Sequence, residues 1–72
     1  MINDYLIVIE ESGTGFAAYS PDVLGCIATG ATREEVEREM HEALEFHIEG
    51  MILEGLPIPT PHTYSKHMKI AA

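Results

Sequence analysis

The sequence predicts an α+β fold in the order β-β-β-α-β, with an antiparallel sheet and one helix packed on one face. Two apolar, β-prone runs at residues 4–10 and 16–19 are joined by a glycine-containing loop, which is typical of an antiparallel hairpin. One long amphipathic pattern with a capping signal at each end predicts a helix over residues 33–54. A β-prone run at residues 63–70 follows a proline-rich connector and predicts a final strand.

The first strand, Asp-Tyr-Leu-Ile-Val-Ile-Glu at residues 4–10, is nearly continuous in apolar character, which is typical of a strand covered on both faces. The five residues 11–15 exceed a two-residue turn, so we expect a longer loop before the second strand. Residues 20–25, which include Pro21 and Gly25, are then expected to interrupt the strand. A short third strand of small residues is expected at residues 26–30.

The helix is predicted from its caps and its apolar stripe. Thr32 and Glu35 form a capping box at the N-terminus, and Gly55 is placed to end the helix. Apolar side chains and one histidine ring recur at spacings of three and four and predict a buried stripe at Val36, Met40, Ala43, Leu44, His47, Ile48 and Met51. Three further apolar residues lie off this stripe and widen the apolar face of the helix near its C-terminal end: Phe46, Ile52 and Leu53.

Charge is the strongest compositional signal, because twelve acidic residues face four basic ones and give a formal net charge of −8. Nucleic acids bind basic surfaces through counterion release and repel acidic ones. We therefore expect no direct nucleic-acid binding and a basic macromolecular partner. Eight acids on the predicted helix form either a solvated face or a docking surface for that partner: Glu34, Glu35, Glu37, Glu39, Glu42, Glu45, Glu49 and Glu54.

The length of 72 residues allows one domain, spanning residues 1–72, and a core this small usually needs an additional source of stability. The one cysteine, Cys26, excludes an internal disulfide and is expected to be buried as a small apolar residue. The histidine spacings contain no zinc pattern, so neither a metal nor a cofactor is expected. Self-association is the remaining source of additional stability, so we expect a homodimer or a higher homo-oligomer.

The N-terminal residues show no signal-peptide pattern, and no apolar run approaches the about 18 residues that a membrane helix needs. A lone thiol fits a reducing compartment, so we expect a cytoplasmic protein without membrane contact. The sequence contains no HExxH, GxSxG or phosphate-loop motif, and no enzymatic activity is expected.

Three motifs, taken in order, resemble the signature of the HicB-like antitoxin family. Residues 15–26, Gly-Phe-Ala-Ala-Tyr-Ser-Pro-Asp-Val-Leu-Gly-Cys, contain the family's glycine and aromatic strand followed by Pro-Asp and Gly-Cys. Residues 30–35 resemble its Gly-x-Thr-x-Glu-Glu helix start, and residues 54–59 resemble its Glu-Gly-x-x-x-Pro helix end. The resemblance covers residues 4–61 and is to a short, stand-alone form without a C-terminal DNA-binding segment.

The resemblance implies a fold of partial RNase H-like type and a role as antitoxin. The partner would be a HicA-like toxin, a small basic protein that cleaves mRNA, and the antitoxin would cover its RNA-binding surface. Acidic groups would then mimic RNA, while apolar groups would slow dissociation. The candidate toxin-binding residues are the acids Glu10, Glu11 and Asp22 on accessible loops and strand ends, the anchors Tyr19 and Leu24, and a second acidic patch of Glu42, Glu45 and Glu49.

Two other functions remain open at this point. A partial nuclease-like fold could retain weak, metal-dependent RNA hydrolysis, in which case Glu10→Gln would abolish the activity. A solitary member of the family could instead act as a regulatory binding module for another protein.

Overall fold

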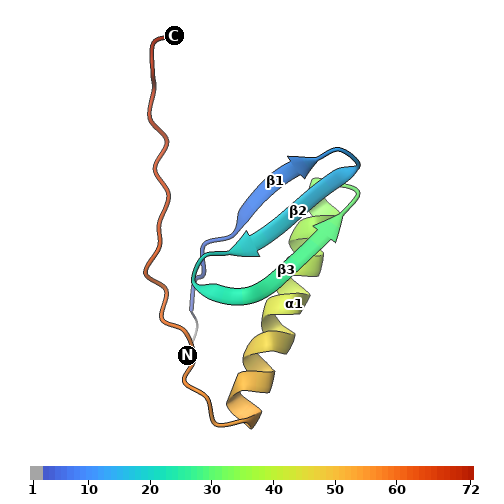
Figure 1. Ribbon diagram of the computed structural model, residues 1–72, viewed down its shortest axis with the longest axis vertical. Helices are drawn as coiled ribbons and strands as arrows, with labels where there is room; N and C mark the ends of the chain where they lie inside the picture. Colours follow the sequence, from blue (N-terminus) through green and yellow to red (C-terminus); the bar gives the residue numbers. More distant parts are fainter. Residues whose placement is uncertain (1–2) are drawn as a thin grey trace.

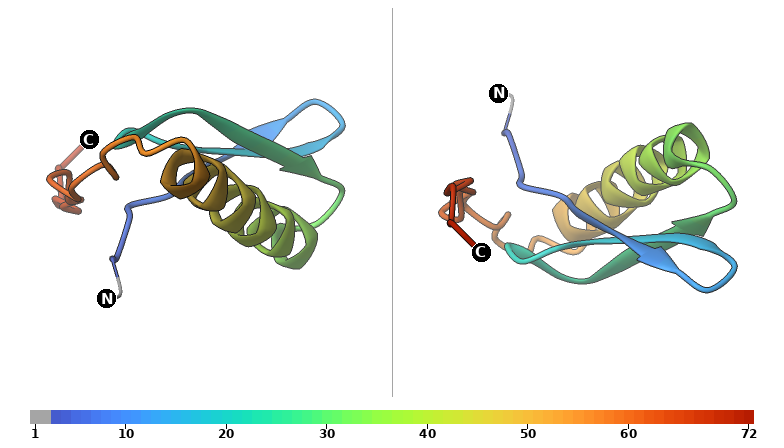
Figure 2. Two further views of the ribbon diagram at one scale, coloured as in Figure 1. Left: turned by 90° about the horizontal axis from the view of Figure 1, so that it is seen from below. Right: turned by 90° about the horizontal axis from the view of Figure 1, so that it is seen from above.

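The computed structural model describes residues 3–72, which form a three-stranded sheet, one helix and a long extended C-terminal segment (Figure 1). The bounds are β1 Val8–Ser12, β2 Gly15–Ser20, β3 Val23–Gly30 and α1 Arg33–Leu53. The strands pair in the order β1-β2-β3, and both pairings are antiparallel. The helix lies on one face of the sheet (Figure 2), so the predicted α+β class and one-sided packing are confirmed.

The first hairpin differs from the expectation in two ways. The last residue of β1 pairs with the first residue of β2, so the connection is a two-residue turn and the predicted five-residue loop is wrong. β1 also begins at Val8 rather than at residue 4. Val8 pairs with Tyr19, and the same register places Pro21 opposite the residue two positions before Val8. Proline has no N–H to donate, so the ladder ends here and residues 4–7 continue outside the strand.

β3 is longer than the sequence predicts, because the expected break at residues 20–25 is only a two-residue turn at Pro21 and Asp22. The pairing with β2 shifts register near the start of β3, which accommodates extra residues as a bulge. Gly25 has a φ of 82°, a left-handed conformation that other residues rarely adopt. Glycine therefore permits the bulge, and the predicted strand at residues 26–30 forms the regular second half of β3.

The caps of α1 lie at the two predicted residues, Thr32 and Gly55, and the bond from Glu35 to Thr32 forms one half of the predicted capping box. The Thr32 hydroxyl oxygen accepts a hydrogen bond from the Glu35 N–H at 3.1 Å, which satisfies a free donor of the first turn. At the other end Gly55 has a φ of 71°. Its N–H and that of the next residue donate to carbonyl groups of the last helical turn at 3.1 and 2.9 Å. These two bonds form a Schellman motif, which ends the helix at Leu53, one residue before the predicted end.

The core lies between α1 and the strands β2 and β3. Val36 and Met40 of the helix are 0% and 1% exposed. The buried cluster also contains Ala18, Val23 and Cys26 from the two strands, which confirms the expected burial of the cysteine. Among the residues that the structure describes, the helix backbone approaches β2 and β3 closely but not β1. The helix-side face of β1 therefore lacks a full cover.

Burial along α1 decreases toward its C-terminus, which extends beyond the sheet (Figure 1). The remaining residues of the predicted stripe are partly buried: Ala43, Leu44, His47, Ile48 and Met51. Phe46, Ile52 and Leu53, which the sequence places off the stripe, are 80%, 56% and 87% exposed, so the part of the apolar face that they add is not covered. Helical geometry turns these three positions away from the sheet.

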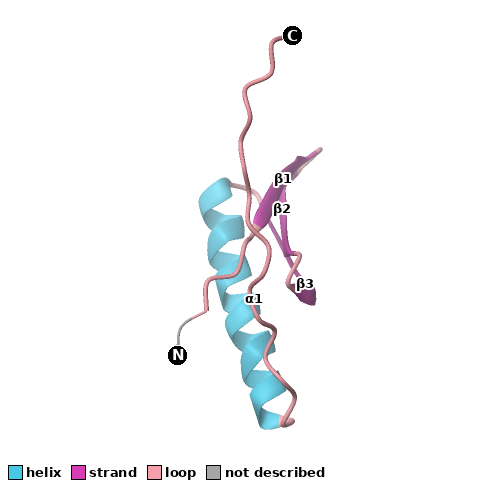
Figure 3. Cartoon of the chain, turned by 90° about the vertical axis from the view of Figure 1, so that its left-hand side faces the viewer, coloured by secondary structure: helices cyan, strands magenta, loops and turns pink. Residues whose placement is uncertain are grey.

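Residues 56–72 contain no strand, so the predicted final strand at residues 63–70 is wrong for the chain by itself. After the helix the chain returns past the sheet and then runs away from it in an extended conformation (Figures 1 and 3). We call residues 64–72 the C-terminal arm. The arm leaves the body of the molecule, so no strand of its own sheet lies beside it to complete a ladder.

Met40→Ala should lower the free energy of unfolding by about 2–5 kcal/mol, because it leaves a cavity between the helix and the sheet. The matched control is Phe46→Ala, which removes an exposed side chain of the same helix and should change that free energy by less than about 0.5 kcal/mol. Urea unfolding followed by circular dichroism measures both values. A loss below about 1 kcal/mol for Met40→Ala would contradict the assigned core.

Candidate functional site

The face of the sheet opposite α1 carries an uncovered apolar row. The strand register places Val8, Tyr19 and Ile27 side by side across the three strands. Their neighbours along each strand contact the core, so alternation directs these three side chains to the other face. Tyr19 is 41% exposed and Ile27 is 70% exposed. We call Val8, Tyr19 and Ile27 the outer-face row.

Of the predicted partner-binding residues, Tyr19 belongs to this row, and Glu10 and Leu24 are exposed near it. Glu10 is exposed on the same face, two positions along β1 from Val8. Leu24, at the bulged start of β3, is 85% exposed. Glu11 is also exposed, but it pairs with a core residue of β2 and so projects from the helix side of β1. The structure therefore brings Glu10 and Tyr19 together on one face and places Glu11 on the other.

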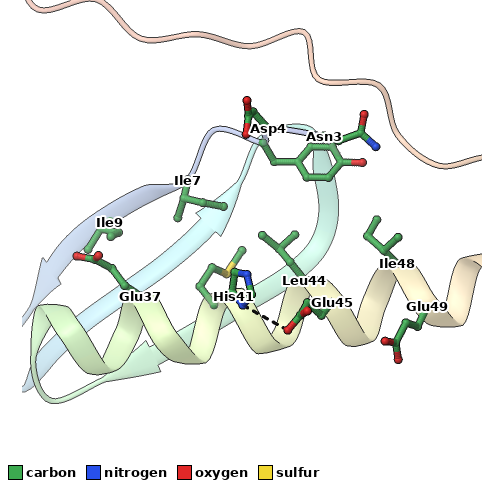
Figure 4. Close-up of a pocket in the computed structure, with 12 residues that line it drawn as sticks. Asn3, Asp4, Ile7, Ile9, Glu37, His41, Leu44, Glu45, Ile48 and Glu49 are labelled. Atoms are coloured by element: carbon green, nitrogen blue, oxygen red, sulfur yellow. Dashed lines mark ion pairs between the residues drawn. The ribbon is translucent and has the colours of Figure 1, made fainter. Parts of the chain in front are cut away.

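A groove with a volume of about 840 Å³ lies on the helix side of the sheet, between residues 3–9 and α1 (Figure 4). Its apolar lining comes from both elements and includes Ile7, Ile9, Leu44 and Ile48. Two members of the predicted second acidic patch, Glu45 and Glu49, also line it, whereas Glu42 does not. His41 Nδ1 lies 3.3 Å from Glu45 Oε1. The two predicted sets of acidic residues thus belong to separate surfaces of the molecule.

Asp22 is buried, so the expectation that a partner can reach its carboxylate is wrong. Its side chain is 0% exposed and binds the segment that leads into the C-terminal arm. Oδ2 accepts hydrogen bonds from the backbone N–H groups of His62 and Thr63, both at 3.1 Å. Oδ1 accepts a hydrogen bond from the Thr63 hydroxyl at 2.6 Å and lies 3.1 Å from His62 Nδ1.

These contacts favour the charged form of Asp22. The hydrogen bond from the Thr63 hydroxyl contributes most to lowering the pKa of Asp22 below its usual 3.8, and the two backbone N–H groups add to it, although burial acts in the opposite direction. A second tie holds the same region, because the Tyr5 hydroxyl donates a hydrogen bond to the Pro59 carbonyl oxygen at 2.7 Å. Together these bonds fix the point from which the arm departs.

Metal-ligating side chains are dispersed in the described structure: within residues 3–72, no three His, Cys, Asp or Glu side chains gather so that they could hold a metal ion. Burial raises the pKa of the Cys26 thiol, which lowers its nucleophilic reactivity near neutral pH. In the part of the chain that the structure describes, no helix is long and apolar enough to cross a membrane.

No local sequence motif predicts two features of these surfaces, the place of Ile27 in the outer-face row and the burial of Asp22. Ile27 stands in a short strand of small residues, and the available signal for an apolar outer face is the continuous apolar run at residues 4–10. Asp22 contacts residues 40 and 41 positions further along the chain. Contacts over such a separation depend on the tertiary fold, so sequence patterns around Asp22 do not reveal them.

The chain is a small acidic α+β protein with an open apolar sheet face, and a face of this kind is typical of interaction surfaces. The chain belongs to the HicB_like antitoxin family of bacterial toxin-antitoxin systems, whose sequence profile matches residues 5–71. This confirms the resemblance that the three motifs indicate.

Individual relatives agree with this assignment. An uncharacterised 14.9 kDa protein from the rep-hol intergenic region of Haemophilus phage HP1 is 34% identical over 89% of this chain and 48% of its own length. The chain therefore spans about half the length of that relative. A chain of a HicA3 and HicB3 toxin-antitoxin complex is 37% identical with a TM-score of 0.72, and the match covers 83% of this chain and 70% of that one. The crystal structure of antitoxin HicB3 is 38% identical with a TM-score of 0.68, over 79% and 42% of the two chains.

Asp22→Asn should lower the free energy of unfolding at pH 7, because an amide cannot accept all the hydrogen bonds that the carboxylate accepts. The folded-state pKa of Asp22 lies below 3.8, so the carboxylate's contribution is complete above that pH and is lost as the pH falls through the folded-state value. The difference between the parent and Asp22→Asn should therefore shrink in acid. Urea unfolding at pH 7, 5, 4 and 3 measures it.

The control for this experiment is Asp4→Asn, which neutralises an exposed aspartate and should change the free energy of unfolding by less than about 0.5 kcal/mol at pH 7. A difference between parent and Asp22→Asn that stays constant from pH 7 to pH 3 would show that the charged form of Asp22 does not hold this segment.

Proposed function

We propose that this chain is an antitoxin that neutralises a small, basic, mRNA-cleaving HicA-like toxin by covering its RNA-binding surface. The observation that carries the proposal is the outer-face row, an apolar surface that the chain itself leaves open. The family assignment supports it, as does the similarity to a chain of the HicA3 and HicB3 complex. The toxin acts on mRNA, so the proposed setting is the cytoplasm.

In this proposal Tyr19 and Ile27 are the central anchors, and Leu24 extends the contact along β3. All three are exposed, and a desolvated aromatic side chain near the centre of an interface typically contributes most to its stability. Loss of such an anchor mainly accelerates dissociation, because the contact is formed only in the docked complex.

The acidic residues supply the charge part of the mechanism. Glu10 lies beside the row, Glu11 lies near the hairpin turn, and the net charge of −8 attracts a basic partner over a longer range. The helix α1 carries a second set of acids, Glu42, Glu45 and Glu49. A toxin docked on the outer face reaches this set only if it also contacts α1 on the other side of the sheet. Asp22 is excluded from the contact set, since its carboxylate is already engaged inside the chain.

The proposal assigns binding and no catalysis to this chain. The competing hydrolase hypothesis is tested directly by incubating the purified chain with RNA and Mg²⁺ or Mn²⁺. RNA cleavage that requires the metal and disappears in Glu10→Gln would overturn a purely binding role.

Surface plasmon resonance against a HicA-like toxin from the same organism, at two salt concentrations, tests the docking surface. Tyr19→Ala and Ile27→Ala should each accelerate dissociation by about tenfold to a hundredfold, because each removes an anchor. Glu10→Gln should slow association several-fold and reduce its dependence on salt.

Leu53→Ala is the control, because it removes an exposed apolar side chain at the C-terminal end of α1, outside the outer-face row, and it should leave both rates unchanged. Circular dichroism verifies that each variant is folded. Absence of binding by the parent chain, or dissociation rates unaffected by Tyr19→Ala and Ile27→Ala, would contradict the proposal.

A further inference from the structure

The C-terminal arm has the side-chain pattern of a strand, and it pairs with no strand among residues 3–72. Along residues 64–70 apolar and polar side chains alternate, with Tyr64, Met68 and Ile70 on one side together with the stem of Lys66. These three apolar residues are 88%, 74% and 79% exposed. An extended segment with one apolar face is suited to pairing with the open edge of a sheet.

A suitable edge exists at β1. In the part of the chain that the structure describes, the strand order β1-β2-β3 leaves the outer edge of β1 without a neighbouring strand, and the backbone of α1 lies close to β2 and β3 rather than to β1. The groove described above opens along this edge (Figure 4). A strand added there would place alternate side chains over Ile7, Leu44 and Ile48. The other edge, at β3, is interrupted by the bulge at Gly25, which disfavours continuous pairing.

The arm and the groove agree in length. Seven extended residues, 64–70, span about 23 Å at about 3.3 Å per residue. The helix wall of the groove runs from Glu37 to Glu49, which corresponds to about 18 Å at about 1.5 Å per residue. The arm therefore covers the full length of the groove.

The arm and the groove also agree in charge. All twelve acidic residues precede residue 63, whereas the arm contains Lys66 and Lys69 and no acid. Four acidic residues line the groove: Asp4, Glu37, Glu45 and Glu49. A basic strand is therefore attracted to the groove, where its lysines can lie beside carboxylates.

The arm of the same chain does not occupy this groove. The bonds from Asp22 to His62 and Thr63 fix its starting point at the turn between β2 and β3, and from there it runs outward, away from α1 and the sheet (Figures 1 and 3). The arm is thus presented to another molecule, and every copy of the chain carries both an arm and a groove.

We propose that residues 64–70 of one copy add as a strand to the free edge of β1 in a second copy and cover its groove, and that the exchange is reciprocal. The interaction surface is then self-complementary, as a twofold dimer requires. It supplies the fourth strand that the sequence pattern predicts, but from the partner. The outer-face row stays open in such a dimer, so this interaction is independent of the proposed toxin contact.

Light scattering coupled to size-exclusion chromatography tests the dimer in the absence of toxin. At micromolar concentration the full chain should show twice the monomer mass of 7.9 kDa. Met68→Asp should weaken the dimer by about tenfold or more in dissociation constant, because it places a charge in the apolar face of the arm. Leu53→Asp makes the same kind of change at another exposed apolar residue and should leave the mass unchanged. A monomer mass for the parent, or a dimer unaffected by Met68→Asp, would overturn the proposal.

Disulfide trapping tests whether the arm crosses to the partner. Met68→Cys and Glu45→Cys, mixed as separate chains under mild oxidation, should form a mixed disulfide, because the arm lies over the groove. Glu39→Cys, outside the groove on the same helix, is the matched control and should not pair with Met68→Cys. A double variant with Met68→Cys and Glu45→Cys should run as a covalent dimer in non-reducing electrophoresis. A double variant that closes on itself as a monomer would show that the arm folds onto its own chain, and it would overturn the exchange.

Discussion

The packing of Val36 and Met40 against β2 and β3 is the contact on which the rest of the molecule depends. It holds a single helix on one face of a three-stranded sheet, and in the described residues the helix backbone lies close to β2 and β3 but not to β1. Two apolar surfaces consequently remain open, the outer-face row and the groove. Within residues 3–72 no helix or strand besides β1–β3 and α1 is available to cover them. A domain of this size buries only about 60% of its unfolded surface.

Asp22 fixes the point at which the C-terminal arm leaves the body of the molecule. Its buried carboxylate gathers three hydrogen bonds from His62 and Thr63 and thereby directs the arm away from the body. One acidic residue is therefore part of the internal structure, while the exposed acids on β1 and α1 remain free to attract a basic partner. Acidic composition alone does not distinguish these two roles; the burial of each carboxylate does.

Local signals in the sequence predict the elements that depend on local interactions. Thr32, Glu35 and Gly55 specify the helix ends, and the structure places both caps as predicted. Features that depend on register or tertiary contact were not predictable in this way. The start of β1 is set by Pro21 across the hairpin, and the burial of Asp22 is set by a segment 40 residues away.

The candidate site was predictable in part. Tyr19 and Leu24, the two anchor residues chosen from the sequence, are 41% and 85% exposed, while Ile27 completes the row only because the register aligns it with Tyr19. The alternating pattern at residues 63–70 indicates an extended conformation correctly, but a sequence does not say which edge an extended segment pairs with.

We assign the outer-face row to a toxin and the groove to a second copy of this chain. Methyl cross-saturation NMR shows in a single experiment which of the two surfaces the toxin covers. A methyl-labelled sample of this chain is mixed with an unlabelled HicA-like toxin, and saturation is transferred from the toxin. We predict transfer to the methyl groups of Val8 and Ile27 on the outer face and none to Ile7 and Ile48 in the groove. Transfer to Ile7 and Ile48 with none to Val8 and Ile27 would contradict the assignment of both surfaces.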